Sequence, residues 1–328
     1  MSYKFFLILN KINRVKTLSN LAREDKRRAT ELRMADWSEL THECLTNVLA
    51  RLSLPDRWLG PMFVCKPWMR ACRDPSLHKS LDLEPWFGSA PDSARLWKPE
   101  FERRIDAMVT NVVEWSEGGL VEIRVRHCSD RSVAFVAERC PNLQFLSVKS
   151  SPHLSDASME KIALNCRNLI ELDISSCYEI SHESLLLIGE NCPNLKTLRR
   201  NFMNWVDSSE HVRVVPNEYL NACPQDGDSE AAAIGKSMRG LEHLELKFSK
   251  LTVQGLARIV EGCVELRYLD LFGCLNLSSR DISTTTEKLT NLNVQKPNFH
   301  VPRSVYLSER YGHWQLYDER FQTDVFRI

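Results

Sequence analysis

Apolar residues in positions 166–192 follow two successive patterns. Leu172 and Ile174 alternate with polar neighbours, which is typical of a strand that buries one face. Leu185 and Ile188 continue at the three-to-four-residue spacing of one helix face. This stretch therefore predicts a strand followed by a helix.

The same unit recurs about six times in residues 115–295, and this repetition determines the expected fold. The strand half returns at Leu120/Ile123/Val125, Leu143/Leu146/Val148, Leu195, Leu241/Leu244/Leu246 and Leu266/Leu269/Leu271. One strand and one helix cannot cover their own apolar face, but stacked copies can. We expect a curved α/β solenoid with strands on the concave side and helices outside. Helical repeats of similar length are the structural alternative, although the strand half is short and alternating.

The eleven cysteines follow the repeat rather than any pairing pattern. Several close a helix face, as Cys140 and Cys166 do, and others follow a strand, as Cys177 does. An odd count without a CxxC pair argues for a reducing compartment, which we expect to be the nucleus or cytoplasm, and against a metal site. In spacing, these units resemble the cysteine-containing subclass of leucine-rich repeats.

Residues 37–82 form a second, smaller unit ahead of the repeats. Leu45, Val48, Leu49 and Leu52 make a helix face after Thr41, which can cap that helix. So short a segment rarely buries enough apolar surface to stand alone, so we expect a partner to complete its core.

The motif W-x-x-L-x-x-E-x-L-x-x-V-L-x-x-L-x-L-x-D, followed by V-C-K-x-W and D-P-x-L, resembles an F-box. The resemblance implies a helical module that docks on the Skp adaptor and, through it, on a cullin scaffold. The positions that it implies for docking are Leu40, Glu43, Leu45, Leu49, Leu52, Leu54, Val64, Cys65, Lys66 and Trp68.

F-box and repeats in this order resemble plant Skp-interacting F-box/leucine-rich-repeat proteins. The implied function is substrate recognition in an SCF-type ubiquitin ligase, with the repeats holding a protein substrate for ubiquitination and degradation. The chain carries no G-x-S-x-G, phosphate-binding glycine loop or H-E-x-x-H motif, so we expect neither catalysis nor a cofactor. The alternative is a leucine-rich-repeat scaffold without a ligase role.

The predicted organisation has five parts: a leader in residues 1–33 that we expect to be disordered, an F-box in 34–82, a rigid junction in 83–114, repeats in 115–295 and a C-terminal cap in 296–328. The junction contains Trp86 and Trp97, which a flexible linker would not carry. A longer repeat carries an insertion at about 199–230, which we expect to be ordered and to lie over the concave face. The tail could also fold back into the substrate groove.

The balance of charge and the lack of a long apolar run argue against two classes of partner. The chain has 43 basic and 43 acidic residues and no run of eighteen apolar residues, so we expect neither nucleic acid nor a membrane as a partner. Outward strand positions would instead contact a protein substrate, although alternating charges there are also typical of a solvated face. The substrate-binding candidates are Arg124, Phe145, Asp173, Arg199, Trp205, His243, Tyr268 and Phe272.

Overall fold

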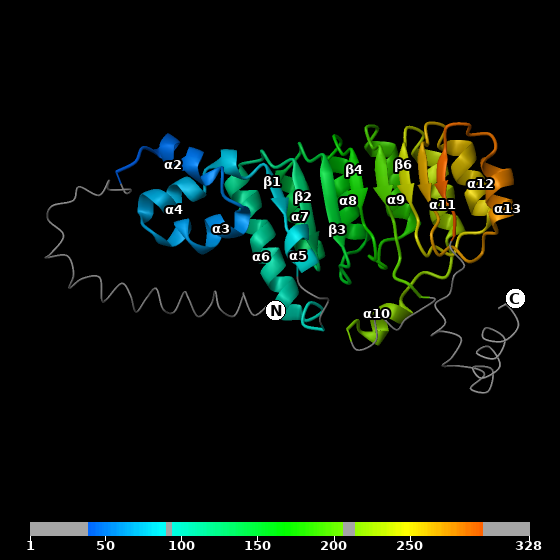
Figure 1. The fold of residues 1–328 in the computed structure, drawn as a ribbon, viewed down its shortest axis with the longest axis horizontal. Coiled ribbons are helices and arrows are strands. Elements are labelled where there is room, and N and C mark those ends of the chain that lie inside the picture. The colour runs from blue at the N-terminus through cyan, green and yellow to red at the C-terminus, as the bar shows by residue number, and fades with distance from the viewer. Residues whose placement is uncertain (1–38, 90–93, 206–213, 298–328) are drawn as a thin grey trace, which may run out of the picture.

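A computed structural model describes residues 39–89, 94–205 and 214–297 of the chain. A group of short helices stands at one end, and a long parallel sheet backed by a row of helices fills the rest (Figure 1). The leader and the tail lie outside the described residues.

The helical group is the segment that resembles an F-box. It comprises α2 (His42–Leu49), α3 (Leu54–Leu59), a 3-10 turn (Pro61–Phe63), α4 (Lys66–Cys72) and a second 3-10 turn (Pro75–Leu77). The Thr41 hydroxyl accepts the Cys44 N–H at 3.4 Å, so this residue caps α2 as its sequence position indicates. Pro67 lies in the first turn of α4, where its missing N–H breaks no helical hydrogen bond.

The sheet has eight described strands, all parallel and in sequence order. They are β1 (Ser80–Asp82), β2 (Glu122–Arg126), β3 (Phe145–Lys149), β4 (Glu171–Asp173), β5 (Thr197–Arg199), β6 (His243–Glu245), β7 (Tyr268–Asp270) and β8 (Asn293–Gln295). Their helices are α5 (Glu84–Ser89), α6 (Pro99–Ser116), α7 (Asp130–Arg139), α8 (Asp156–Asn165), α9 (His182–Asn191), α10 (Asn217–Asn221), α11 (Asp228–Ser237), α12 (Val253–Gly262) and α13 (Ser279–Thr286). The predicted α/β repeat fold is confirmed, and the sheet extends one strand beyond the six predicted repeats at each end.

Most of the cysteines are buried, and several donate hydrogen bonds from one repeat to the preceding one. The thiols of Cys166 and Cys192 each contact the backbone carbonyl of the preceding repeat's cysteine at 3.6 Å. Burial raises the pKa of the Cys166 thiol to about 12, so it stays protonated and unreactive. All eleven cysteines are free.

Aspartates at the helix starts link successive repeats. The Asp130 carboxylate accepts the Ser155 N–H at 2.8 Å, and Asp156 accepts the Ser181 N–H at the same distance. His182 stands where the next aspartate would, and Asp228 resumes the pattern by binding the backbone and hydroxyl of Thr252 at 2.7 Å. The longer repeat begins where this series is interrupted.

The helical group keeps a small core of its own and joins the core of the repeats through Leu54. Leu54 of α3 belongs to the apolar core that runs through the repeats, and β1 pairs directly with β2. The Trp115 ring, at the end of α6, contacts Trp58 at 6.0 Å and His78 at 5.3 Å between ring centroids. The F-box segment is therefore packed directly on the first repeat.

The insertion lies along the edge where the strands end, beyond which α10 is visible in Figure 1. Tyr219 of α10 stacks on Tyr178 at 4.6 Å and contacts Trp97 of the junction at 4.6 Å. These residues form an apolar cluster separate from the main core, which we term the edge cluster: Tyr178, Phe202, Val215, Tyr219 and Cys223. The described segment around α10 therefore packs at this edge and not over the concave face as predicted, whereas Arg199, at the start of the insertion, lies in β5 on the exposed face of the sheet.

Candidate functional site

Leucines of the F-box motif point into the protein rather than toward a partner. Leu45 and Leu49 are fully buried in the core of the helical group, and Leu54 is buried in the core of the repeats. The half-buried candidates Leu40, Leu52 and Trp68 pack against the helical core. The amphipathic pattern therefore marks residues that support the module from within.

Among the described residues of the module, three of the four exposed large apolar side chains lie on α3 and the turn after it, and the fourth, Val48, lies on α2 with 39% exposed. Phe63 is 64% exposed and Val64 is 61% exposed, with Leu59 at 38%. We term these three residues the F-box apolar patch. Among the docking candidates, Glu43 and Lys66 are exposed and Cys65 is half-buried. Phe63 and Leu59 were missed from the sequence because they do not follow the leucine spacing.

The second candidate surface is the face of the sheet that the helices do not cover (Figure 1). Strand pairing aligns Arg124, Ser147, Asp173, Arg199, Glu245 and Asp270 in one column, and Glu122, Phe145, Glu171, Thr197, His243 and Tyr268 in the next. This register confirms the alignment predicted from the repeat. We term the surface the sheet face.

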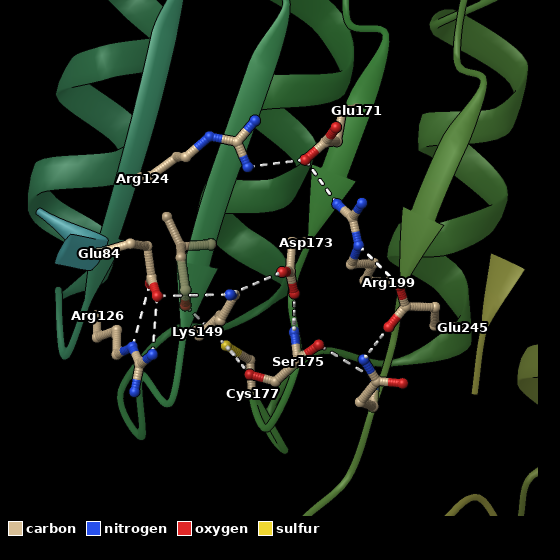
Figure 2. Close-up of polar contacts among 12 residues, drawn as sticks. Glu84, Arg124, Arg126, Lys149, Glu171, Asp173, Ser175, Cys177, Arg199 and Glu245 are labelled. Atoms are coloured by element: carbon tan, nitrogen blue, oxygen red, sulfur yellow. Dashed lines mark hydrogen bonds and ion pairs between the residues drawn. The ribbon is translucent and has the colours of Figure 1, made fainter. Parts of the chain in front are cut away.

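Two arginines of the sheet face, Arg124 and Arg199, each join two carboxylates, and Figure 2 shows Glu171, which they share. Arg124 forms ion pairs with Glu122 at 2.7 Å and Glu171 at 2.9 Å. Arg199 then links Glu171 at 2.6 Å to Glu245 at 2.9 Å. Side chains of alternating charge on β2, β4, β5 and β6 are therefore linked in one chain, in which the guanidinium groups of Arg124 and Arg199 are both paired.

Lysines extend the same arrangement at the strand ends. Lys149 lies 3.3 Å from Asp173, and Lys247 lies 3.5 Å from Glu245 and 3.3 Å from Asp270. Burial by itself raises the pKa of Glu245, but hydrogen bonds from His243 and Asn201 and the charge of Lys247 lower it to about 2. Glu245 therefore stays ionised and paired throughout the physiological pH range.

Aromatic residues gather at the C-terminal part of the sheet face. The His243 and Tyr268 rings stack at 4.4 Å with 13° between their planes. Phe272 contacts Phe248 edge-on at 5.5 Å, and the Trp205 indole N–H donates to the Phe248 carbonyl at 2.6 Å. Trp205 and Phe272 therefore meet at Phe248, past the ends of β6 and β7, whereas the His243–Tyr268 stack lies where these two strands begin.

The structure brings most substrate-binding candidates onto one surface, but their accessibility differs. Arg124, Phe145, Arg199, His243, Tyr268 and Phe272 are half-buried, with part of each side chain open to solvent. Asp173 is only 2% exposed, because Lys149 and its own strand neighbours cover it. Asp173 therefore supports the charged network from below and offers little surface to a partner.

Two other site classes have no support in residues 39–89, 94–205 and 214–297. This part of the chain contains no cluster of three His, Cys, Asp or Glu side chains suited to a metal ion. It also contains no helix with the length and apolar character needed to cross a membrane.

Comparisons with known proteins agree with both modules. The F-box domain family matches residues 37–80. F-box protein SKIP1 of Arabidopsis thaliana is 59% identical over 297 residues, covering 90% of this chain and 98% of that protein. The chain belongs to the plant F-box/leucine-rich-repeat family. Putative F-box/LRR-repeat protein 19 of the same plant is 54% identical, covering 84% of this chain and 92% of that protein.

Similarity to solved structures is weaker. The match to a chain in the crystal structure of the yeast Rad7 and Elc1 complex covers 93% of this chain and 89% of that chain, with a TM-score of 0.31 and 12% identity. A likeness of this size supports no argument about function. The resemblance to plant F-box/leucine-rich-repeat proteins that the sequence predicts is thus confirmed by the relatives alone.

Proposed function

We propose that the protein is the substrate-recognition subunit of an SCF-type ubiquitin ligase. Its F-box and F-box/leucine-rich-repeat relatives support such a role in general. Proteins of this family are adaptors and generally not catalysts. The finer proposal is that the F-box docks on a Skp adaptor, and through it on a cullin, while the sheet face holds a protein substrate.

The observation that carries the docking proposal is the F-box apolar patch. Phe63 and Val64 are each more than 60% exposed and adjacent, although the helical group buries its leucines well. Large apolar side chains that stay exposed in a patch beside polar residues are typical of protein interfaces. Exposed Glu43 and Lys66 are placed to contribute polar contacts around an adaptor.

The packing between modules supports the second half of the proposal. Trp115 contacts Trp58 and His78 from the F-box segment, and the Arg73 guanidinium lies 5.5 Å from the Trp115 ring centroid. Such packing holds the sheet face at a fixed angle to the adaptor. A fixed angle favours ubiquitin transfer because the reaction depends on how often a substrate lysine meets the carrier.

A paired substitution tests the docking proposal. We expect Phe63→Asp combined with Val64→Asp to weaken co-purification with a Skp adaptor at least about tenfold, because both charges would lie in the interface. The matched control is Val264→Asp, since Val264 is 55% exposed but lies after α12, far along the chain from the F-box. Unchanged thermal unfolding of both variants excludes a folding defect.

Adaptor binding that survives the paired substitution would contradict this docking surface. A full-length chain that is folded but binds no Skp adaptor would instead favour the scaffold function, with the sheet face as the binding surface.

The free thiols are compatible with the nucleus or cytoplasm, which we propose as the site of action.

A further inference from the structure

The sheet face carries more negative than positive charge. At the outward positions of the eight strands and at the second residue after each strand, it presents the cations Arg124, Arg126, Lys149, Arg199 and Lys247 and the carboxylates Asp82, Glu84, Glu122, Glu171, Asp173, Glu245 and Asp270. Seven carboxylates against five cations leave an excess of two negative charges. No net positive field therefore attracts an anion to this face.

Each of those five cations is already engaged by a carboxylate of the same face. Arg124 and Arg199 share Glu171, Arg126 pairs with Glu84 at 2.7 Å, and the two lysines each contact an aspartate at 3.3 Å. The pairs are half-buried, so solvent screens them less than exposed pairs. An incoming phosphate would have to displace a carboxylate that cannot leave the face.

Uncharged ring surface is available beside this network. The stacked His243 and Tyr268 side chains lie on neighbouring strands in direct register, and the His243 side chain is 31% exposed. Two of their polar atoms are occupied: His243 Nε2 lies 3.0 Å from Glu245, and the Tyr268 hydroxyl donates to Asp270 at 3.4 Å. The remaining contact surface of the pair is therefore largely apolar.

We propose that the sheet face recognises an unphosphorylated protein segment that places an aromatic or aliphatic side chain against the His243–Tyr268 pair. This proposal rests on the proposed role of the sheet face in substrate binding and adds the chemical class of the substrate. Phosphoamino acids are usually bound by free arginines in bidentate contact, and here the arginines hold carboxylates instead. Aromatic anchors in partly desolvated positions dominate many protein interfaces.

Two peptide pools test the proposal directly on the full chain, with no adaptor present. Both pools are degenerate and contain Phe, Tyr, Trp, Leu and Ile equally, and they differ only in a central Ser/Thr or its phosphorylated form. We expect retention of the unphosphorylated pool with enrichment of aromatic or aliphatic residues. Fluorescence anisotropy should show that phosphorylated versions of the retained peptides bind at least about tenfold more weakly.

Substitutions assign the effect to this surface. Tyr268→Ala should weaken the retained peptides at least about tenfold while leaving the unfolding midpoint nearly unchanged, because Tyr268 is half-exposed. Glu171→Gln removes the carboxylate that Arg124 and Arg199 share and leaves each arginine with one carboxylate partner, Glu122 or Glu245, so it should reduce the penalty for phosphorylation. The matched control is Glu160→Gln on the outer helix α8, which removes the same charge away from the face and should change nothing.

Preferential retention of the phosphorylated pool would overturn the proposal, as would retention of neither pool. Peptide binding that Tyr268→Ala leaves intact would overturn the assigned anchor. Because the measurement omits the Skp adaptor, these outcomes are distinguishable from a failure of the F-box to dock, which is measured separately with the Phe63/Val64 variant.

Discussion

Arg200 and Glu230 form the most deeply buried ion pair among the described residues, and replacing Glu230 should destabilise the protein strongly. The Arg200 side chain is fully buried and the Glu230 side chain is 8% exposed. The guanidinium donates twice to Glu230, at 3.1 and 2.8 Å, and also to the carbonyls of Ile174, Cys177 and Ile180. Arg200 thereby ties the start of the insertion to the turn after β4.

Glu230→Gln preserves the shape of the side chain but removes the carboxylate that forms an ion pair with Arg200. Removing one partner of a buried pair leaves an uncompensated charge and costs about 3–5 kcal/mol. This is a large share of the roughly 5–15 kcal/mol that stabilises a typical domain. We therefore expect a clear fall in the free energy of unfolding, measured by urea titration with circular dichroism.

Hydrogen exchange should localise the effect to residues that Arg200 holds. Amides of α10 and of the turn after β4 should exchange faster in Glu230→Gln, while those of α7 should change little. Glu183→Gln is the matched control because Glu183 lies exposed in the first turn of α9 and should cost less than about 0.5 kcal/mol. A loss below about 1 kcal/mol in Glu230→Gln would refute the reasoning that the pair neutralises a buried charge.

Two further predictions concern pH and helix packing. Burial lowers the pKa of His127 from 6.5 to about 4, so the fold favours the neutral ring. Stability should therefore be full above pH 6.5 and fall by up to about 3 kcal/mol toward pH 4, and urea titrations should show a flatter profile for His127→Gln. Gly262→Ala should cost more than about 2 kcal/mol in thermal or urea unfolding, because a Cβ there would lie 1.7 Å from the Gly235 carbonyl oxygen. Gly240→Ala is its control, with 3.8 Å to the nearest atom, and an equal loss in both would contradict the packing argument.

Strand register was predictable because the repeat fixes it. Once Leu146, Leu172 and Leu198 occupy one inward column, the residues on either side must align on the other face of the sheet. The terminal strands β1 and β8 were not predicted, because each has three residues and only one inward apolar residue, Leu81 or Val294. Their position is set by pairing with a neighbour rather than by their own pattern.

The charge pairing of the sheet face was only partly predictable. The sequence indicates alternating charges in columns, but Arg124 and Glu171 are 47 residues apart and contact each other diagonally across β3. Such contacts depend on side-chain length and on the small Ser147 between them, which is buried. Only the structure therefore shows whether the charged side chains of this face are solvated singly or pair with one another.

The F-box motif was predicted correctly as a segment, but the spacing of its leucines did not show which of them the chain itself buries. Amphipathic spacing identifies which residues share a helix face and does not say whether that face meets a partner or the rest of the chain. Leu45 and Leu49 meet α4, and Leu54 meets the repeats. Phe63 and Val64 stand out only after these contacts are known, because they are what remains exposed.

The two modules pack on each other, because Leu54 of the helical group lies in the core of the repeats, and this contact limits how docking can be tested. A truncation that begins after residue 83 would remove Leu54 from the repeat core and β1 from the edge of β2. The shortened chain would expose apolar surface and an unpaired strand edge, so it could lose binding or aggregate for reasons unrelated to the adaptor. Substitution of Phe63 and Val64 leaves that core intact, because both side chains lie mostly in solvent. Adaptor binding and substrate binding are therefore separable by surface substitutions even though the two modules are not separable as folding units.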